Sequence, residues 1–456
     1  MQWLFTWLED TENNMTDTQK KDTHVARVDW NSDKQRTRLE KRYRLEKIFK
    51  SCAVLSLVAA IAALLIVLIS VFSTGISGFQ ETRINLDVTF DQTIIGDLTP
   101  FDQEDLDNHI ASININRMLV NSLQEKFPDV RSRSDLFSLL KLFSVGAQGD
   151  IRKAIRNDPS LVGKTITIDL LASSDVDMLM KGKISRDVVE GNRKITDQQL
   201  IWIDQFISED NIKKGFNYKF FTSGDSREPE LAGIWSSTVG SFLTLVVTFF
   251  ISFPIGVGSA IYLEEFAPKN RITDLIEINI NNLAAVPSII FGLLGLAIFI
   301  NFMYLPRSAP LVGGLTLALM TLPTIIITSR AAIKAVPPSI KEAAIGLGAS
   351  HMQTVFHHIL PLSMPGILTG SIIGMAQALG ETAPLLMIGM VAFIVDTPGG
   401  ILEASTALPV QVYLWADSPE RGFLEKTSAA IMVLLLFLIV MNGLAIWLRQ
   451  KFEKKW

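Results

Sequence analysis

Cysteine is almost absent from this chain of 456 residues, because Cys52 is the only one. A single cysteine cannot form an internal disulfide, so cysteine usage does not reveal the redox compartment. An excess of either charge is also missing: 42 Lys and Arg stand against 46 Asp and Glu, for a net charge of -4. This balance gives no indication of nucleic-acid binding, and we expect no nucleic-acid partner.

A complete nucleotide-binding loop is missing as well. The nearest approach is Gly-Lys-Thr at residues 163–165, but the first glycine of that motif would have to stand where Asp158 is found. We therefore expect this chain to bind no cofactor and not to be an enzyme. No metal site is expected either, because no further ligand in a fixed geometry accompanies the histidines of one polar segment, His351, His357 and His358.

Long apolar runs dominate what is present. The mean hydropathy of +0.31 is high for a soluble protein of this length. About six stretches approach or exceed the ~20 residues that an α-helix needs to cross ~30 Å of hydrocarbon. They lie at residues 52–74, 233–263, 282–304, 311–333, 366–395 and 428–448. This pattern predicts an all-α polytopic membrane protein with about six transmembrane helices.

Both ends of the chain are basic. Residues 1–51 carry a dense run of Lys and Arg directly before the first apolar stretch, which places this tail in the cytoplasm by the positive-inside rule. Residues 52–74 are too long for a signal-peptide core, so we expect them to remain as a membrane helix. The basic tail at residues 449–456 fits a cytoplasmic C-terminus after an even number of spans. The start of translation is either Met1 or Met15.

A polar segment separates the first two apolar stretches. Residues 75–231 are rich in Asp, Asn, Ser and Lys, and they would be periplasmic if the first helix runs outward. The alternating run at residues 165–168 is typical of a strand, and the run at 136–143 is typical of a helix. We therefore predict an inserted periplasmic α+β domain.

The segment after the fourth apolar stretch, residues 334–361, is too structured for a simple connection. Its apolar residues recur at helical spacing in two short blocks, Ile340, Ala343, Ala344 and Leu347, then Met352, Val355, Phe356 and Ile359. Gly346 and Gly348 stand between the blocks, where a sharp bend needs a residue that tolerates φ > 0. Two short helices joined by such a bend suit docking into a groove on a cytoplasmic partner.

This segment resembles the EAA loop of ABC-importer permeases. The residues that match the pattern of that family are Glu342, Ala343, Ala344, Gly348, Leu360 and Pro361. One position departs from it, because His358 replaces the expected branched apolar residue and Ile359 takes its packing role. The resemblance implies that the loop couples the permease to a nucleotide-binding subunit. The alternative is a loop that merely links two helices.

Longer strings are similar to one branch of these permeases, the PstA family of phosphate importers. They lie at residues 255–268, 282–296 and 379–386. The resemblance implies a type I ABC-importer core at residues 232–448 in a bacterial inner membrane, preceded by the extra domain of an extended variant. The implied partners are a homologous permease, two ATPase subunits that use ATP and Mg²⁺, a periplasmic phosphate-binding protein and membrane lipid.

A carboxylate in the fifth apolar stretch is the main candidate for the substrate path. Glu381 is its only acidic residue, and an intramembrane acid is a functional hypothesis by default, with a helix–helix contact as the alternative. Gln377 stands one turn earlier, and Thr382 adds a hydroxyl. Arg330, near the end of the fourth stretch, either binds an anion or extends to the interface.

The predicted function is that of a phosphate-importer permease. Two alternatives stay open: a permease for another oxyanion, such as molybdate or sulfate, and a membrane sensory or scaffold protein that uses the periplasmic domain. Competition by those anions tests the first alternative, and a dispensable EAA loop would favour the second.

Overall fold

The computed structural model describes residues 33–96, 103–391 and 393–452. The expected tail at residues 1–51 lies largely outside the described residues, and so does the end of the C-terminal tail. The chain divides into two compact units, residues 1–68 and 69–456. Most of the described residues belong to the second unit, which holds the sheet and all of the helices after the first apolar stretch.

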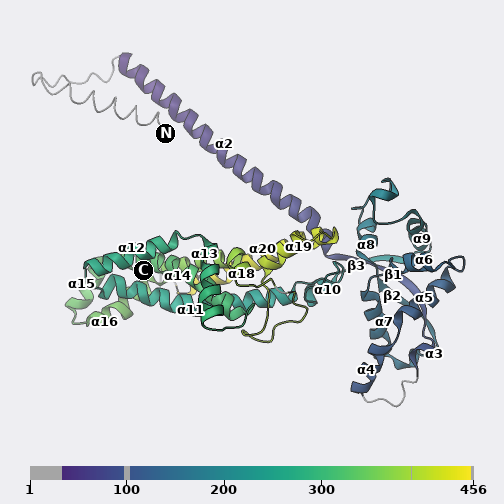
Figure 1. Ribbon diagram of the computed structural model, residues 1–456. Helices are drawn as coiled ribbons and strands as arrows, with labels where there is room; N and C mark the ends of the chain where they lie inside the picture. Colours follow the sequence, from purple (N-terminus) through teal and green to yellow (C-terminus); the bar gives the residue numbers. More distant parts are fainter. Residues whose placement is uncertain (1–32, 97–102, 392, 453–456) are drawn as a thin grey trace, which may run out of the picture. The chain divides into compact units, whose positions relative to one another are not determined.

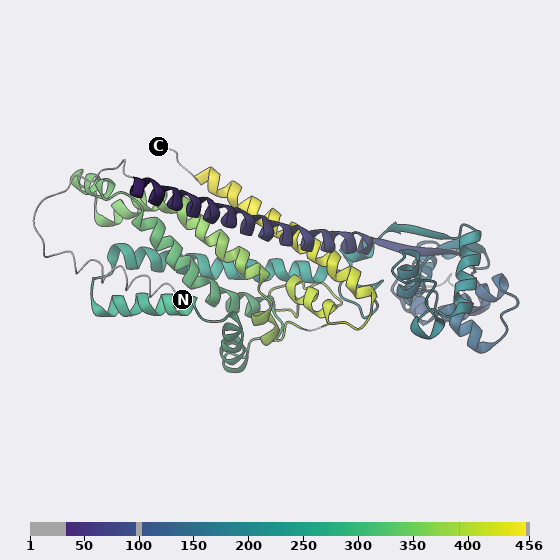
Figure 2. The same cartoon turned by 90° about the horizontal axis from the view of Figure 1, so that it is seen from above.

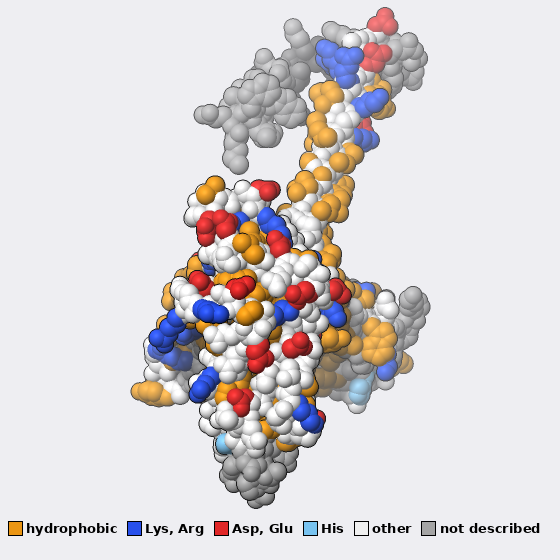
Figure 3. All heavy atoms as spheres, turned by 90° about the vertical axis from the view of Figure 1, so that its right-hand side faces the viewer, with side chains coloured by type: hydrophobic (Ala, Val, Ile, Leu, Met, Phe, Trp, Pro, Cys, Tyr) orange, Lys and Arg blue, Asp and Glu red, His pale blue; other side chains and the backbone are white. Residues whose placement is uncertain are grey.

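Helix α2, Asp33–Gly78, contains the first apolar stretch and crosses from the first unit into the second. It begins well before residue 52, so part of the predicted basic tail is helical. Figure 3 shows basic side chains near its N-terminal end and hydrophobic side chains along the remainder. Residues Thr37–Gly78 are long and apolar enough to cross a membrane, which confirms the first predicted span as a helix.

Residues 79–231, here called the α+β domain, contain a three-stranded sheet with the order β2-β1-β3 (Figure 1). Both pairings are antiparallel. The strands are β1 Gln80–Thr89, β2 Thr165–Leu171 and β3 Ile212–Phe216. The helices are α3 Gln92–Ile95, α4 Gln103–Ser112, α5 Ile115–Lys126, α6 Arg133–Leu140, α7 Gly146–Asn157, α8 Ser174–Met180, α9 Asp197–Ser208 and α10 Tyr218–Thr222. The predicted α+β composition is confirmed, and the runs at 165–168 and 136–143 fall largely in β2 and α6.

The core of the α+β domain follows the alternation of β1. Ile84, Leu86 and Val88 point to one face and are buried, because alternate side chains of a strand share a face. They pack with buried residues of α5, α7 and α9, including Leu123 and Phe206. Each such side chain contributes roughly 1.5–3 kcal/mol when it is removed from water. This core allows the segment to fold as a compact body on its own sheet.

The membrane core, residues 232–452, is built from long apolar helices. They are α11 Trp235–Ile261, continued by the π-helical turn η3 Tyr262–Phe266; α14 Pro310–Lys334; α17 Leu360–Gly380; and α20 Gly422–Phe452. With α2, five helices among the described residues are long and apolar enough to cross a membrane. The predicted stretches at 233–263, 311–333 and 428–448 are confirmed as helices, although α20 runs a turn beyond 448.

The third apolar stretch is not the straight span that the sequence predicted at 282–304. Helix α12, Arg271–Ala284, is followed by α13, Ser288–Gly295, and the π-helical η4, Leu296–Phe302, at a bend of 101°. Pro287 explains the bend, since it has no N–H to donate and disfavours helical backbone in the residue before it. Counted as one span, the bent pair brings the candidate spans among the described residues to six.

The fifth apolar stretch also differs from its prediction. The helix ends at Gly380, and Glu381 has extended backbone with φ -78° and ψ 123°. The short helix α18, Ala383–Met387, follows the break, and irregular chain then leads to α19, Leu408–Ala416. Pro384 lies in the first turn of α18, where the missing N–H costs nothing. The prediction that Glu381 lies in the middle of a helical span is therefore wrong.

Small residues allow the long helices to approach closely, as is typical inside membranes. Figure 1 shows α11 and α14 running side by side, and α17 packs along α14 (Figure 2). A Cβ on Gly314 would lie 2.5 Å from Val247, and a Cβ on Gly370 would overlap the Thr328 hydroxyl. The Thr248 hydroxyl donates to the Gly314 carbonyl at 3.2 Å. These contacts fix α14 between its two neighbours.

Irregular chain at residues 388–391 and 393–407 lies at the end of the membrane core next to the α+β domain, where the Asp225 amide donates to the Ile394 carbonyl. Hydroxyl groups bond to its backbone and to the first amide of α19. Ser308 Oγ donates to the Gly389 carbonyl at 2.5 Å, Thr406 Oγ1 donates to the Met390 carbonyl at 3.1 Å, and Ser241 Oγ accepts from the Leu408 amide at 2.7 Å. Polar backbone at this depth therefore has partners within the protein.

Buried ion pairs join the α+β domain to the first turn of α20. Lys181 Nζ lies 3.1 Å from Glu425 Oε2 and 2.6 Å from Asp177 Oδ2, and the Lys181 and Glu425 side chains are almost wholly buried. Gly422 lies so close to α8 that a Cβ there would overlap the Ser174 hydroxyl. The domain and the last membrane helix are thus packed together, with no room for a larger side chain.

A buried carboxylate at this junction predicts a pH effect on stability. Burial raises the pKa of the Asp225 carboxyl, and the Trp415 indole N–H, which donates to it at 2.9 Å, partly offsets that rise. A folded-state pKa above the unfolded value of about 3.9 favours the protonated form, so the contribution is present at low pH and is lost as pH rises through the folded pKa.

Asp225→Asn is therefore expected to raise the thermal midpoint by a few °C at pH 8 and to leave it unchanged near pH 4, because Asn keeps an acceptor for Trp415 without ionising. Thermal unfolding in detergent at both pH values measures this. Ser226→Ala serves as the neighbouring control. An Asn variant less stable than the parent at pH 8 would contradict the prediction.

Candidate functional site

The predicted loop at 334–361 folds as two short helices and a bend. Helix α15, Pro338–Gly346, begins with proline at its first position, where no donor is lost. Gly348 has φ +90°, which confirms its predicted role, whereas Gly346 is simply the last residue of α15. Ser350 then forms a capping box with Gln353 and starts α16, His351–Thr354, which continues through the π-helical η5, Val355–Ile359, into α17.

The two predicted apolar faces divide into buried and exposed residues. Ala344, Val355 and Ile359 are buried against the membrane core. Leu347 is 91% exposed at the bend, and the other large apolar side chains exposed on the loop are Ile345, Met352 and Phe356. Together these four are called the coupling surface. Apolar side chains held outward by a rigid bend are typical of a protein-binding site.

Glu265 holds the loop to the end of α11. Its carboxylate lies 2.5 Å from Lys341 Nζ of α15, and its backbone carbonyl lies 2.9 Å from His351 Nε2 of α16. The His351 ring also packs edge-on against Phe266 at 5.0 Å between centroids. Both helices of the loop are therefore attached to the same turn, η3. A displacement of the loop would be transmitted to α11.

Arg330 also links separate elements of the membrane core through ion pairs. Its guanidinium lies 2.7 Å from Glu277 of α12 and 3.3 Å from Glu264 of η3, so it links three elements. Neither Glu264 nor Glu277 was predicted from the sequence, and nor was the pairing of Lys341 with Glu265. The signal that could have revealed these ion pairs is the presence of acidic residues in otherwise apolar segments, because a carboxylate there needs a partner.

The four residues predicted for the substrate path do not all meet. Glu381, Thr382 and Gln377 cluster at the break between α17 and α18, with Gln377 exposed and the other two half-buried. The Glu381 carboxylate has no hydrogen bond or ion pair within the described part of the chain. Arg330 is level with residues 366–370 of α17, because Ala332 and Thr328 meet Gly366 and Gly370, so Glu381 is about 20 Å further along the axis.

The remaining predicted residues lie in α15, η5 and the start of α17. Glu342 and Ala343 are exposed on α15, and Leu360 and Pro361 begin α17. His357 and His358 are exposed on η5. Within residues 33–96, 103–391 and 393–452, no group of three His, Cys, Asp or Glu side chains could hold a metal ion. The candidate site thus consists of exposed apolar side chains on a loop attached to a helix bundle, with one carboxylate at a helix break.

Comparisons with known proteins identify both parts of the chain. Residues 252–454 match the family described as binding-protein-dependent transport system inner membrane component. Residues 36–190 match a domain of unknown function, DUF3333. The chain is 28% identical to the probable ABC transporter permease protein YqgI of Bacillus subtilis, over 58% of this chain and 98% of that protein.

Phosphate transport system permeases of the PstC type and of the PstA type are among the relatives. The chain is 30% identical to the phosphate transport system permease protein PstC of Pasteurella multocida, over 53% of this chain and 82% of that one. It is 28% identical to PstA of Haemophilus influenzae, over 52% of this chain and 81% of that one. The predicted family is thereby confirmed, and its members are membrane transport subunits, not enzymes. This chain belongs to the phosphate transport system permeases of the ABC importers.

Proposed function

We propose that this chain is a permease subunit of an ATP-driven importer of inorganic phosphate in a bacterial inner membrane. The observation that carries the proposal is the coupling surface, which presents Leu347 at 91% exposure on a loop fixed to α11 through Glu265. Two cytoplasmic ATPase subunits would bind ATP and Mg²⁺, and one of them would receive this loop. The names of the relatives support phosphate as the substrate.

The proposed topology follows from the charge of α2. Its basic N-terminal part and the coupling loop would face the cytoplasm, as would the C-terminus, and the α+β domain would be periplasmic. A homologous permease would pack against the surface on which Gln377 is exposed, and the two subunits together would form the anion path. A periplasmic phosphate-binding protein would deliver substrate to the opposite end of the membrane core, near Gly389 and Met390.

The need for ATP is electrostatic. Moving one negative charge inward against a potential of about 100 mV, inside negative, costs about 2.3 kcal/mol, and a dianion costs about twice that. Accumulation from scarce phosphate adds a concentration term. Rigid attachment of the coupling surface to α11 and, through Arg330, to α12 and α14 would convert ATPase closure into movement of the path-lining helices.

The test is uptake of radiolabelled phosphate at limiting concentration in a strain that lacks only this chain, with and without plasmid rescue. Loss of uptake, rescue, and no competition by sulfate or molybdate are the expected results. Competition by either anion would point to another oxyanion as substrate. Unchanged uptake in the deletion strain, together with a dispensable coupling loop, would favour a sensory or scaffold role.

Glu381→Ala is expected to lower phosphate uptake about tenfold or more while the complex still assembles, because its carboxylate faces the helix break without a protein partner among the described residues. Uptake in vesicles and size-exclusion chromatography of the purified complex measure the two effects. Asp417→Ala, at the exposed end of α19, is the control. Wild-type transport by the Glu381 variant would return that residue to a structural role.

A further inference from the structure

We propose that the α+β domain rests on the phospholipid headgroups next to it through an aromatic surface at its junction with the membrane helices. This surface, called the junction aromatic surface, consists of Phe79, Phe216, Tyr218 and Phe221. The proposal depends on the membrane placement of α2 and α11 and not on the identity of the transported substrate.

The depth of the surface is set by the two membrane helices that flank it. Helix α2 ends at Gly78, and Phe79 follows directly. The register of β1 and β3 pairs Gln80 with Phe216, which places Phe216 about 7 Å from the helix end. Trp235, half-exposed, opens α11 on the return. The rings therefore lie at the level of the headgroup layer that flanks the ~30 Å hydrocarbon core.

The chemistry of the surface fits a headgroup layer. Phe216 is 49% exposed and Tyr218 is 71% exposed, and their rings are 4.9 Å apart in an edge-on arrangement. Phe221 stacks on Phe216 at 5.7 Å. Lys213 and Lys214 are exposed on the same edge strand, β3. Tyr218 is the one ring of this surface with a polar tip, and a tyrosine together with lysines that reach toward phosphate groups is a usual anchor at a membrane interface, with the three phenylalanines adding apolar area.

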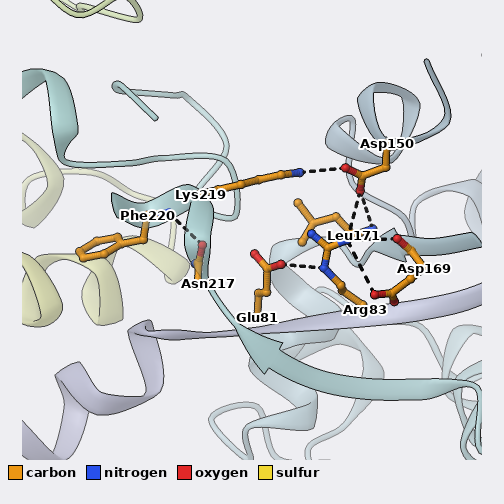
Figure 4. A network of polar contacts seen from close by, with 8 residues as sticks. All are labelled: Glu81, Arg83, Asp150, Asp169, Leu171, Asn217, Lys219 and Phe220. Carbon is orange, nitrogen blue, oxygen red and sulfur yellow. Dashed lines mark hydrogen bonds and ion pairs between the residues drawn. The ribbon is translucent and has the colours of Figure 1, made fainter. Parts of the chain in front are cut away.

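The rings are held rigidly, so contact with lipid headgroups would restrict few additional side-chain motions. Figure 4 shows Lys219 of α10 reaching Asp150 of α7, at 3.2 Å from Nζ to Oδ1, while Asp150 Oδ2 accepts from the Leu171 amide of β2 at 3.3 Å. Asn217 caps α10 by accepting from the Phe220 amide at 2.9 Å. The wholly buried Phe220 ring then packs edge-on against Phe79 at 5.6 Å.

This fixed geometry distinguishes the surface from Phe137, an aromatic residue of the same domain that is 62% exposed on α6. The ammonium group of Lys141 lies over the Phe137 ring. No aromatic ring among the described residues packs against Phe137. It belongs to no strand or helix adjacent to a membrane span. Phe137 is therefore a matched control, with an exposure between those of Phe216 and Tyr218 and no predicted lipid contact.

The experiment uses the whole transporter complex with Cys52→Ser as background, because this removes the only native cysteine of the chain. Tyr218→Cys and, separately, Phe137→Cys are labelled with an environment-sensitive bimane. The complex is placed in nanodiscs of phosphatidylethanolamine and phosphatidylglycerol, with or without bromine near the headgroup end of the acyl chains. Phe216→Cys supplies a second position should the first variant fold poorly.

We expect the probes at 218 and 216 to emit at shorter wavelength in nanodiscs than the probe at 137, and to lose emission when the lipid is brominated. The probe at 137 should change in neither respect. Equal behaviour of all three probes would overturn the proposal. A blue shift at 218 without quenching by brominated lipid would also overturn it, because it would mean that another protein subunit covers the surface.

Discussion

Replacing Leu347 by aspartate is expected to disconnect this permease from its ATPase and abolish uptake, while the helix bundle stays folded. The side chain is 91% exposed at the bend of the loop, so the change disturbs no packing within the chain. In the proposed complex the same side chain would be buried, and the variant would place an unpaired charge there. A central apolar anchor of this kind is worth about 3 kcal/mol, or roughly a hundredfold in affinity.

Co-purification of the ATPase with the tagged permease, together with ATP-driven uptake, measures this loss. Glu342→Lys, on exposed α15, should act in the same direction because it reverses a charge beside the bend. Val189→Asp is the matched control, since Val189 is 76% exposed but lies in the α+β domain. Normal recovery of the ATPase with the Leu347 variant would remove the coupling surface from the proposed interface.

Arg330→Leu is expected to destabilise the membrane core itself. The substitution leaves the carboxylates of Glu264 and Glu277 facing each other without the cation that now lies between α14, α12 and η3. Removing one partner of a partly buried ion network costs about 2 kcal/mol. For a helix bundle of this size we expect a fall of about 4–8 °C in the thermal midpoint, with reduced transport at growth temperature.

Lys334→Leu provides the matched comparison, because Lys334 is exposed one turn further along α14 and forms no ion pair within the described residues. Thermal aggregation in detergent, followed by light scattering, compares the two variants. Arg330→Lys should recover part of the stability, since an ammonium can contact one carboxylate but not hold both in a fork. If Arg330→Leu kept its thermal midpoint and lost only phosphate binding, the anion-binding hypothesis for Arg330 would be preferred.

The membrane helices could be predicted from the sequence because a span leaves a strong signal, an uninterrupted apolar run. At two breaks in the chain that signal failed to give the geometry, although Pro254 and Pro323 lie inside helices that were predicted correctly. Pro287 turns the third stretch by 101°, and the break at Glu381 ends the fifth helix early. A run of apolar residues indicates burial in lipid but does not give the direction of the helix axis. That direction depends on backbone hydrogen bonds, which proline removes.

Part of the candidate site could also be predicted from the sequence. The spacing of apolar residues gave both loop helices, and Gly348 has the predicted positive φ. The bracing by Glu265 was not predictable, since its partner Lys341 lies 76 positions away and pairing across such distances has no local pattern. Nor did the sequence reveal which apolar residues face outward. Helical spacing placed Leu347 and Ala344 on one face, but only the packed structure leaves the first exposed and buries the second.

The pairing of Gln80 with Phe216 has a consequence for how such a chain could arise. The first and last strands of the α+β domain are neighbours, so the chain leaves its sheet close to the point where it entered. The Bacillus subtilis relative matches over 98% of its length while spanning only 58% of this chain, so it has no room for both parts. A piece whose ends lie close together can be gained or lost in one genetic event without redirecting any transmembrane segment. Selection can then alter the domain and the transport machinery at separate rates.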